Sequence, residues 1–118
     1  MKLVSITKSK AKGKKWTALF SYENDKKKTI HFGATGYLDY TIGATDEQRK
    51  NYLSRHDKEK NQAADTAGAL SYYILWGESK SMSKNIKYFK NKYMFNIYYA
   101  FCKNKIYKGR RRKRYTMS

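Results

Sequence analysis

A chain of 118 residues fits a single domain with a modest core, because chains divide into several domains only at greater lengths. It carries 27 basic and nine acidic side chains, a net charge of +18, so a compact body would repel itself unless a polyanion neutralised it. One cysteine excludes an intramolecular disulfide, and no apolar run reaches the roughly 20 residues of a membrane span. We therefore expect a soluble intracellular protein with a polyanionic partner.

The first third of the chain alternates apolar and polar residues, which is the pattern of β-strands. The turn-forming stretch "ENDKK" predicts a hairpin between the second and third strands, and "KSKAKGKK" predicts a longer, charged connection between the first and second. Strands are expected over residues 2–7, 15–23 and 27–33, with core-facing positions Val4, Ile6, Trp16, Ala18, Phe20, Tyr22, Ile30 and Phe32.

The stretch "HFGATGYLDYT", residues 31–41, allows two interpretations. Its glycines could turn backbone N–H groups toward a phosphate, although a lone G-x-x-G is a weak signal. We favour the architectural interpretation, in which Gly33 and Gly36 adopt positive φ where the third strand leaves the sheet. Tyr37 and Tyr40 would then fold back as lids over the core.

The period changes to that of helices from residue 45 onward. The sequence "TDEQ" is a capping box in which Thr45 and Gln48 satisfy each other's backbone N–H groups, so a helix is expected over residues 46–60. Asp65 or Thr66 can cap a second, more apolar helix that ends at Gly77 and forms the centre of the core.

The serines of "ESKSMS" can cap a third helix with one apolar stripe. That stripe consists of Met82, Ile86, Phe89 and Tyr93, and lysines cover the remaining surface. The following "MFNIYYAFCKNKIY" could continue the helix or add a strand. We predict an α+β fold with a three-stranded antiparallel sheet and two or three helices packed on one face. Residues 1–93 would form this domain and residues 94–118 an apolar, then basic, extension.

Few residues suit catalysis, and no metal or cofactor site is expected, because two histidines and one cysteine lack ligand spacing. His31 could act as a general base with Asp39, as in a small nuclease, but a histidine opposite the apolar face of a strand is more often simply exposed or capped. His56 is expected to interact with the helix dipole or a carboxylate. We therefore expect a protein that is not an enzyme.

The charge is concentrated at both ends of the chain, with +7 over residues 1–35, −2 over residues 36–79 and +13 over residues 80–118. Basic runs of this kind bind phosphates without reading bases, although an A+T-rich coding sequence also raises lysine and tyrosine counts. Interleaved tyrosines could stack on single-stranded bases. The predicted phosphate contacts are Lys12, Lys14, Lys15, Lys84, Lys87, Lys90, Lys108, Arg110, Arg111, Arg112, Lys113 and Arg114.

A resemblance to a known family spans residues 1–93. It rests on four blocks of sequence, "TIHFGATGYLDYT", "RKNYLSRH", "DTAGALSYYILWG" and "NIKYFKNKY". Together they resemble a family of small basic proteins of uncharacterised function from nucleocytoplasmic large DNA viruses. The matching positions are residues 31–41, Arg55 with His56, and residues 66–76. The resemblance implies no catalytic residues, and the chain departs from the family by its tail after Met94.

The resemblance implies a giant-virus setting, in which small basic proteins condense DNA or brace the capsid. We expect a non-enzymatic virion protein that binds nucleic acid, in the first place DNA, and that lies in the virion and in the host cytoplasm or nucleus. The alternative is a minor capsid protein whose basic arms follow acidic surfaces of neighbouring capsid proteins. The oligomeric state is left open.

Overall fold

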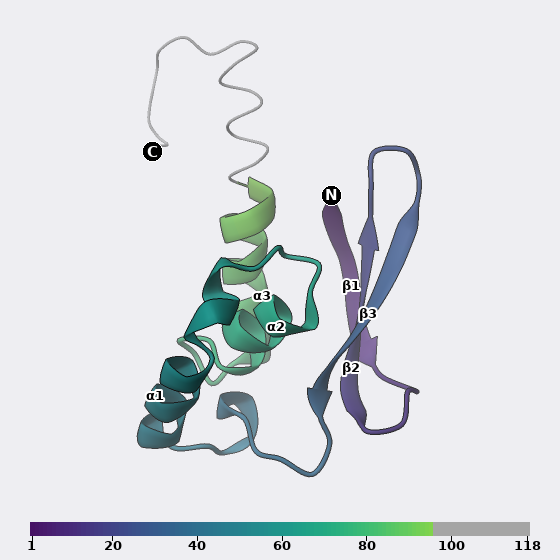
Figure 1. Cartoon of the computed structure of the whole chain (residues 1–118). Helices are drawn as coiled ribbons and strands as arrows, with labels where there is room; N and C mark the ends of the chain where they lie inside the picture. Colours follow the sequence, from purple (N-terminus) through teal and green to yellow (C-terminus); the bar gives the residue numbers. More distant parts are fainter. Residues whose placement is uncertain (96–118) are drawn as a thin grey trace, which may run out of the picture.

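A computed structural model describes residues 1–95 of the chain (Figure 1). Three antiparallel strands, β1 (Lys2–Lys8), β2 (Lys14–Ser21) and β3 (Lys27–Ala34), form a sheet in the order β1-β2-β3. The helical segments follow in the chain and lie against one side of the sheet, and the core lies between the two layers. The predicted α+β fold is therefore confirmed.

The alternation predicted for β2 and β3 is confirmed by their burial. Ala18, Phe20 and Phe32 are fully buried, and Trp16 and Ile30 pack at the edge of the same core. The register explains this arrangement, because Trp16 pairs with Phe32 and Ala18 pairs with Ile30, so apolar side chains meet across the two strands.

The predicted core face of β1 is wrong at Val4, which is 44% exposed, while Leu3 is buried. The cause is a β-bulge, since the ladder pairs Leu3 with Phe20 and then Ser5 with Leu19, which leaves Val4 as an extra residue. The bulge reverses the alternation at that point. Ile6 consequently returns to the core side, as predicted.

The capping box predicted at residue 45 is present at the start of α1 (Asp46–Arg55). The backbone N–H of Gln48 donates to Thr45 Oγ1 over 3.1 Å, and the Thr45 N–H donates to Gln48 Oε1 over 2.8 Å. A short 3-10 turn, η1 (Tyr40–Ile42), precedes this helix.

The predicted end of this helix at residue 60 is wrong, because α1 ends at Arg55 and a 3-10 turn, η2 (Asp57–Asn61), follows. The segment "DKEKN" offers no apolar side chain for packing, so nothing favours a further α-helical turn there. Instead, His56 Nδ1 lies 3.2 Å from Glu59 Oε2 within the tighter turn. The expectation that His56 meets a carboxylate is thereby confirmed.

The central helix of the core is α2 (Ala67–Leu70), which continues into a wider π-type turn, η3 (Ser71–Leu75). Thr66 caps it, since its Oγ1 accepts a hydrogen bond from the Ala69 N–H. Leu70 and Ile74 are fully buried, which confirms the predicted role of this segment.

The third helix, α3 (Met82–Lys90), is capped by Ser81 and continues into a π-type turn, η4 (Asn91–Phe95). Its predicted apolar stripe is confirmed, because Met82, Ile86, Phe89 and Tyr93 all belong to the core or pack against it. The chain thus stays helical as far as Phe95. The rest of the predicted extension lies outside the described residues.

One polar contact joins the hairpin end of the sheet to the start of α2. The Tyr22 hydroxyl donates to Asp65 Oδ2 over 2.6 Å, and Lys28 Nζ lies 3.5 Å from the same oxygen. The hydrogen bond from Tyr22, assisted by the charge of Lys28, holds the pKa of Asp65 below its usual value. The same hydrogen bond raises the pKa of Tyr22 to about 12.

We expect the Tyr22→Phe variant to lose stability in a way that depends on pH. Because the pKa of Asp65 is lowered in the folded state, Asp65 contributes to folding stability above about pH 4, and this contribution is lost as pH falls further. Because the pKa of Tyr22 is raised, Tyr22 contributes to folding stability below about pH 10, and this contribution is lost as pH rises toward 12. Urea unfolding of both proteins should therefore differ most between about pH 5 and 9.

Tyr88→Phe is the matched control, because Tyr88 is exposed and its hydroxyl makes no hydrogen bond within residues 1–95. Its stability should match that of the unchanged protein at every pH. A Tyr22→Phe difference that stayed constant from pH 3 to pH 11 would show that the Tyr22–Asp65 hydrogen bond is not its source.

Candidate functional site

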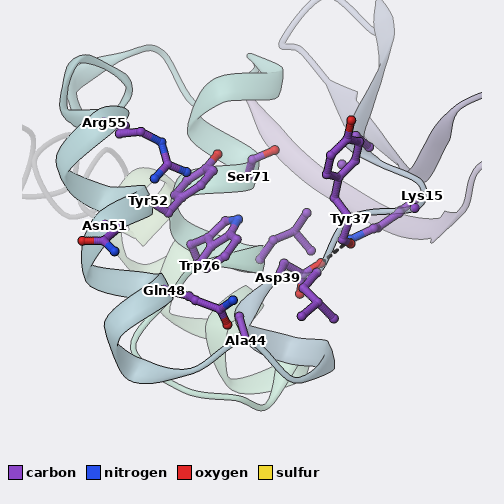
Figure 2. Close-up of a pocket in the computed structure, with 15 residues that line it drawn as sticks. Lys15, Tyr37, Asp39, Ala44, Gln48, Asn51, Tyr52, Arg55, Ser71 and Trp76 are labelled. Atoms are coloured by element: carbon purple, nitrogen blue, oxygen red, sulfur yellow. Dashed lines mark hydrogen bonds and ion pairs between the residues drawn. The ribbon is translucent and has the colours of Figure 1, made fainter.

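A pocket of about 700 Å³ lies between the helical layer and the segment that leaves β3 (Figure 2). This volume is within the range of about 300–1,000 Å³ that is usual for small-molecule sites. One wall comes from α1, from η3 and from Trp76, and the other comes from β2 and residues 33–39. The lining residues are Lys15, Gly33, Ala34, Gly36, Tyr37, Leu38, Asp39, Ala44, Gln48, Asn51, Tyr52, Arg55, Ser71, Leu75 and Trp76.

The stretch "HFGATGYLDYT" supplies the second wall of this pocket. Gly33 and Gly36 have φ values of +81° and +87°, which confirms the predicted positive φ at the end of β3. The predicted lids are wrong, because Tyr37 is 72% exposed and lines the pocket instead of the core. Tyr40 is held at the start of α1, where its hydroxyl donates to Asp46 Oδ1 and Arg49 lies over its ring.

A buried ion pair fixes the position of this segment. Asp39 is only 2% exposed, and its Oδ2 lies 2.8 Å from Lys15 Nζ. Lys15 also donates to the carbonyl oxygen of Tyr37 over 2.6 Å, and Asp39 Oδ1 accepts hydrogen bonds from the N–H and the hydroxyl of Thr41. Lys15 therefore anchors residues 37–41 to β2, and its ammonium group is largely removed from solvent.

Stacked rings form the helical wall. The rings of Tyr52 and Trp76 lie 4.3 Å apart and are tilted by only 6°, and His56 stacks on the other face of Tyr52 at 4.1 Å. Arg49 supports this stack, because its Nε donates to the carbonyl oxygens of Trp76 and Gly77. Burial raises the pKa of Tyr52 to about 12, so its hydroxyl stays neutral at physiological pH and can donate a hydrogen bond.

Several polar groups in this pocket have no partner within residues 1–95. The Tyr52 hydroxyl, the Ser71 hydroxyl and the Trp76 indole N–H make no hydrogen bond there, and the Arg55 guanidinium makes neither a hydrogen bond nor an ion pair. Figure 2 shows the Ser71 hydroxyl and the Trp76 indole nitrogen pointing toward the open space of the pocket. Three of these groups are partly buried and Arg55 is exposed, so all four are accessible to water or to a ligand.

The structure does not bring His31 and Asp39 together as a catalytic pair. His31 is exposed, its Nδ1 lies 2.8 Å from Thr17 Oγ1, and it does not line the pocket. Asp39 is committed to Lys15 and Thr41. In the described part of the chain, no group of three or more histidine, cysteine, aspartate or glutamate side chains could hold a metal ion.

The predicted phosphate contacts occupy separate places on the molecule. Lys84, Lys87 and Lys90 are exposed on α3, which contains no acidic residue, and Lys12 and Lys14 are exposed at the β1–β2 connection. None of these five lysines forms a salt bridge within residues 1–95. Lys15 differs because it is paired with Asp39. The remaining predicted contacts, from Lys108 to Arg114, lie beyond the described residues.

Sequence reasoning missed the pocket wall on α1. Gln48, Tyr52 and Arg55 are separated by four and three residues, which places them on one face of the helix. From the sequence we predicted a capped helix here, but no pocket. The available signal was one aromatic residue, Tyr52, among polar residues at helical spacing.

Comparisons with known proteins give relatives without an assigned function. Residues 4–56 match a family of unknown function, DUF5754, and this region includes most of the sheet, residues 33–44 and α1. The chain is 34% identical over 80 residues to the uncharacterised protein L851 of Acanthamoeba polyphaga mimivirus, and the alignment covers 62% of this chain and 80% of that protein.

No solved structure matches the chain. Among residues 1–95, no helix has the length and apolar character needed to cross a membrane. The alignment with the mimivirus protein covers most of that relative, and it agrees with the giant-virus resemblance of the sequence blocks. The chain therefore belongs to a family of uncharacterised giant-virus proteins that includes this mimivirus protein.

Proposed function

We propose that this protein is a non-enzymatic, basic virion protein that binds nucleic acid, in the first place DNA, through phosphate contacts and without sequence specificity. Its family membership supports a viral setting, and its charge supports a polyanionic partner. Binding of this kind would serve the condensation or packaging of DNA. The proposal assigns no catalytic group to the chain.

One observation carries the proposal, namely the exposed lysine surface of α3, which we define as Lys84, Lys87 and Lys90. All three side chains are exposed on a helix whose opposite side is packed into the core, so the backbone that presents them is rigid. Helical spacing of three residues puts successive lysines about 4.5 Å apart along the axis. Such a surface releases counterions when it meets a row of phosphates.

The overall balance of charge favours the same conclusion. Residues 1–95 contain 19 basic and nine acidic side chains, a net charge of +10, and the remaining residues contain eight basic side chains and no acidic one. Ion pairs within residues 1–95 involve the basic side chains of Lys15, Lys28, Lys60 and His56, whereas exposed lysines such as Lys84, Lys87 and Lys90 are available to a ligand. Contacts with phosphates hold a protein on DNA but carry no sequence information.

We expect the full-length protein to bind duplex DNA with an affinity that falls steeply with salt, and Lys84→Gln/Lys87→Gln/Lys90→Gln to reduce that dependence. Each phosphate contact contributes about −0.9 to the slope of log affinity against log salt. The slope of the triple variant should therefore be less negative by about 2 to 3. Fluorescence anisotropy with duplexes of two unrelated sequences, at salt concentrations from about 50 to about 300 mM, measures the affinity and its dependence on salt.

The matched control is Lys2→Gln/Lys50→Gln/Lys58→Gln, which removes the same charge from three exposed lysines on other elements. Equal effects of the two triple variants would contradict a specific role for the lysine surface of α3. Binding to polyglutamate as tight as binding to DNA would instead support the alternative, in which the basic surface meets acidic capsid proteins. Different affinities for the two duplexes would contradict the absence of sequence specificity.

A further inference from the structure

The pocket between α1 and residues 33–39 is distinct from the exposed lysine surface of α3, and its walls suit a flat ligand. The Trp76 ring, stacked on Tyr52, forms part of one side, and Tyr37 stands on the opposite side (Figure 2). Aromatic side chains in such positions bind planar heteroaromatic rings by stacking or edge contacts. Leu75 and Leu38 add apolar lining.

Three of the unused polar groups of the pocket can only donate hydrogen bonds. The Trp76 indole and the Arg55 guanidinium can only donate, and the Tyr52 and Ser71 hydroxyls can donate or accept. In Gln48, Oε1 already accepts from the Thr45 N–H, so its free amide group is also a donor. A ligand with several acceptors, such as the carbonyl oxygens and ring nitrogens of a nucleobase, complements these donors.

The charge of the lining selects a negative ligand. Lys15 and Asp39 neutralise each other, which leaves the Arg55 guanidinium as the uncompensated charge among the residues that line the pocket. Arginine binds phosphate oxygens through two parallel hydrogen bonds, and Arg55 is exposed near Tyr52 at one side of the pocket. A planar base inside and a phosphate at Arg55 together describe one nucleotide.

We infer that this pocket binds a single nucleotide, with the base against the Tyr52 and Trp76 wall and the phosphate at Arg55. The nucleotide could be free in solution or could be an unpaired residue of a single strand, because both present the same base and phosphate. The inference goes beyond the proposed function, since neither source requires the lysine surface of α3.

The chain contains two tryptophans, Trp16 at the edge of the core and Trp76 in the pocket, so their indole N–H signals in a ¹⁵N NMR spectrum report on two places. Trp16→Phe assigns the two signals. Titration of the full chain with adenosine or uridine 5′-monophosphate should shift the Trp76 signal to saturation and leave the Trp16 signal nearly unchanged. Ribose 5-phosphate, which lacks a base, should not saturate the Trp76 shift.

Arg55→Gln should weaken mononucleotide binding about tenfold, because a charge-assisted contact is worth about 1.4 kcal/mol or more. Lys50→Gln, on the same helix but outside the pocket lining, should leave it unchanged. Tyr52→Phe keeps the ring and should weaken binding less than Arg55→Gln. The Lys84/Lys87/Lys90 triple variant should retain mononucleotide binding, which separates this test from that of the proposed function.

A short oligothymidylate distinguishes the two sources of the nucleotide. Saturation of the Trp76 shift by both the oligomer and the mononucleotides assigns the pocket to nucleotides in general, whereas saturation by the oligomer alone assigns it to unpaired residues of a strand. Saturation by ribose 5-phosphate at the same concentration would overturn the inference and leave an anion site. An unchanged Trp76 signal with every probe would overturn it as well.

Discussion

Replacing Asn85 by alanine is expected to lower the free energy of unfolding by about 2 to 4 kcal/mol, because buried polar groups would lose their partners. Asn85 is 3% exposed, and its Nδ2 donates to the carbonyl oxygens of Ile74 and Ser79 over 2.8 and 2.7 Å. Its Oδ1 accepts from the Ser79 N–H over 3.1 Å. One side chain therefore satisfies the backbone at the end of η3 and in the connection to α3.

The side chain of Asn85 fits in its place because residue 77 is a glycine. A Cβ atom at Gly77 would lie 2.6 Å from Asn85 Cγ, so the glycine leaves space for the amide to reach the backbone. We predicted Gly77 only as the end of a helix. Its φ is not positive, so the close approach of the Tyr73 carbonyl oxygen and of the Asn85 amide is the physical reason for a residue without a side chain here.

Thermal and urea unfolding measure the loss, with Asn91→Ala as the matched control on an exposed asparagine of η4. Hydrogen exchange adds a local measurement, since the Ser79 amide should exchange faster in the Asn85→Ala variant than global unfolding explains. Equal stability of the two variants, with unchanged exchange at Ser79, would show that the amide does not hold this connection.

Replacing Lys15 by methionine is expected to cost about 3 to 5 kcal/mol, because it leaves Asp39 buried without its cation. Asp39 keeps its hydrogen bonds from Thr41, but they face Oδ1, whereas Lys15 is the partner of Oδ2. The segment from Tyr37 to Thr41 would also lose its anchor on β2. We therefore expect both a lower melting temperature and a disturbed pocket wall.

The double variant Lys15→Met/Asp39→Asn should recover part of that loss, since it removes the unpaired charge together with its former partner. Lys14→Met is the control, because Lys14 is exposed and unpaired within the described residues. A double variant as unstable as Lys15→Met would indicate that the aliphatic packing of Lys15, rather than the ion pair, stabilises this segment.

The sequence alone predicted the elements whose signals are local. Period-two alternation placed Ala18, Phe20 and Phe32 in the core, and the capping box at Thr45 marked the start of α1. The spacing of Ile86 and Phe89 indicated the buried side of α3, which left its lysines exposed. These outcomes depend on backbone geometry and on neighbours within a few residues, so the order of residue types is sufficient.

Tertiary structure decided the features that join distant residues. The bulge at Val4 follows from pairing with β2, and the burial of Asn85 follows from the space beside Gly77. Lys15 was predicted as one phosphate contact among many, yet it meets Asp39, 24 residues away. The pocket likewise combines Tyr37, Tyr52 and Trp76 from three parts of the chain. Such contacts are set by how the layers pack, and no local pattern of residues encodes the distance between them.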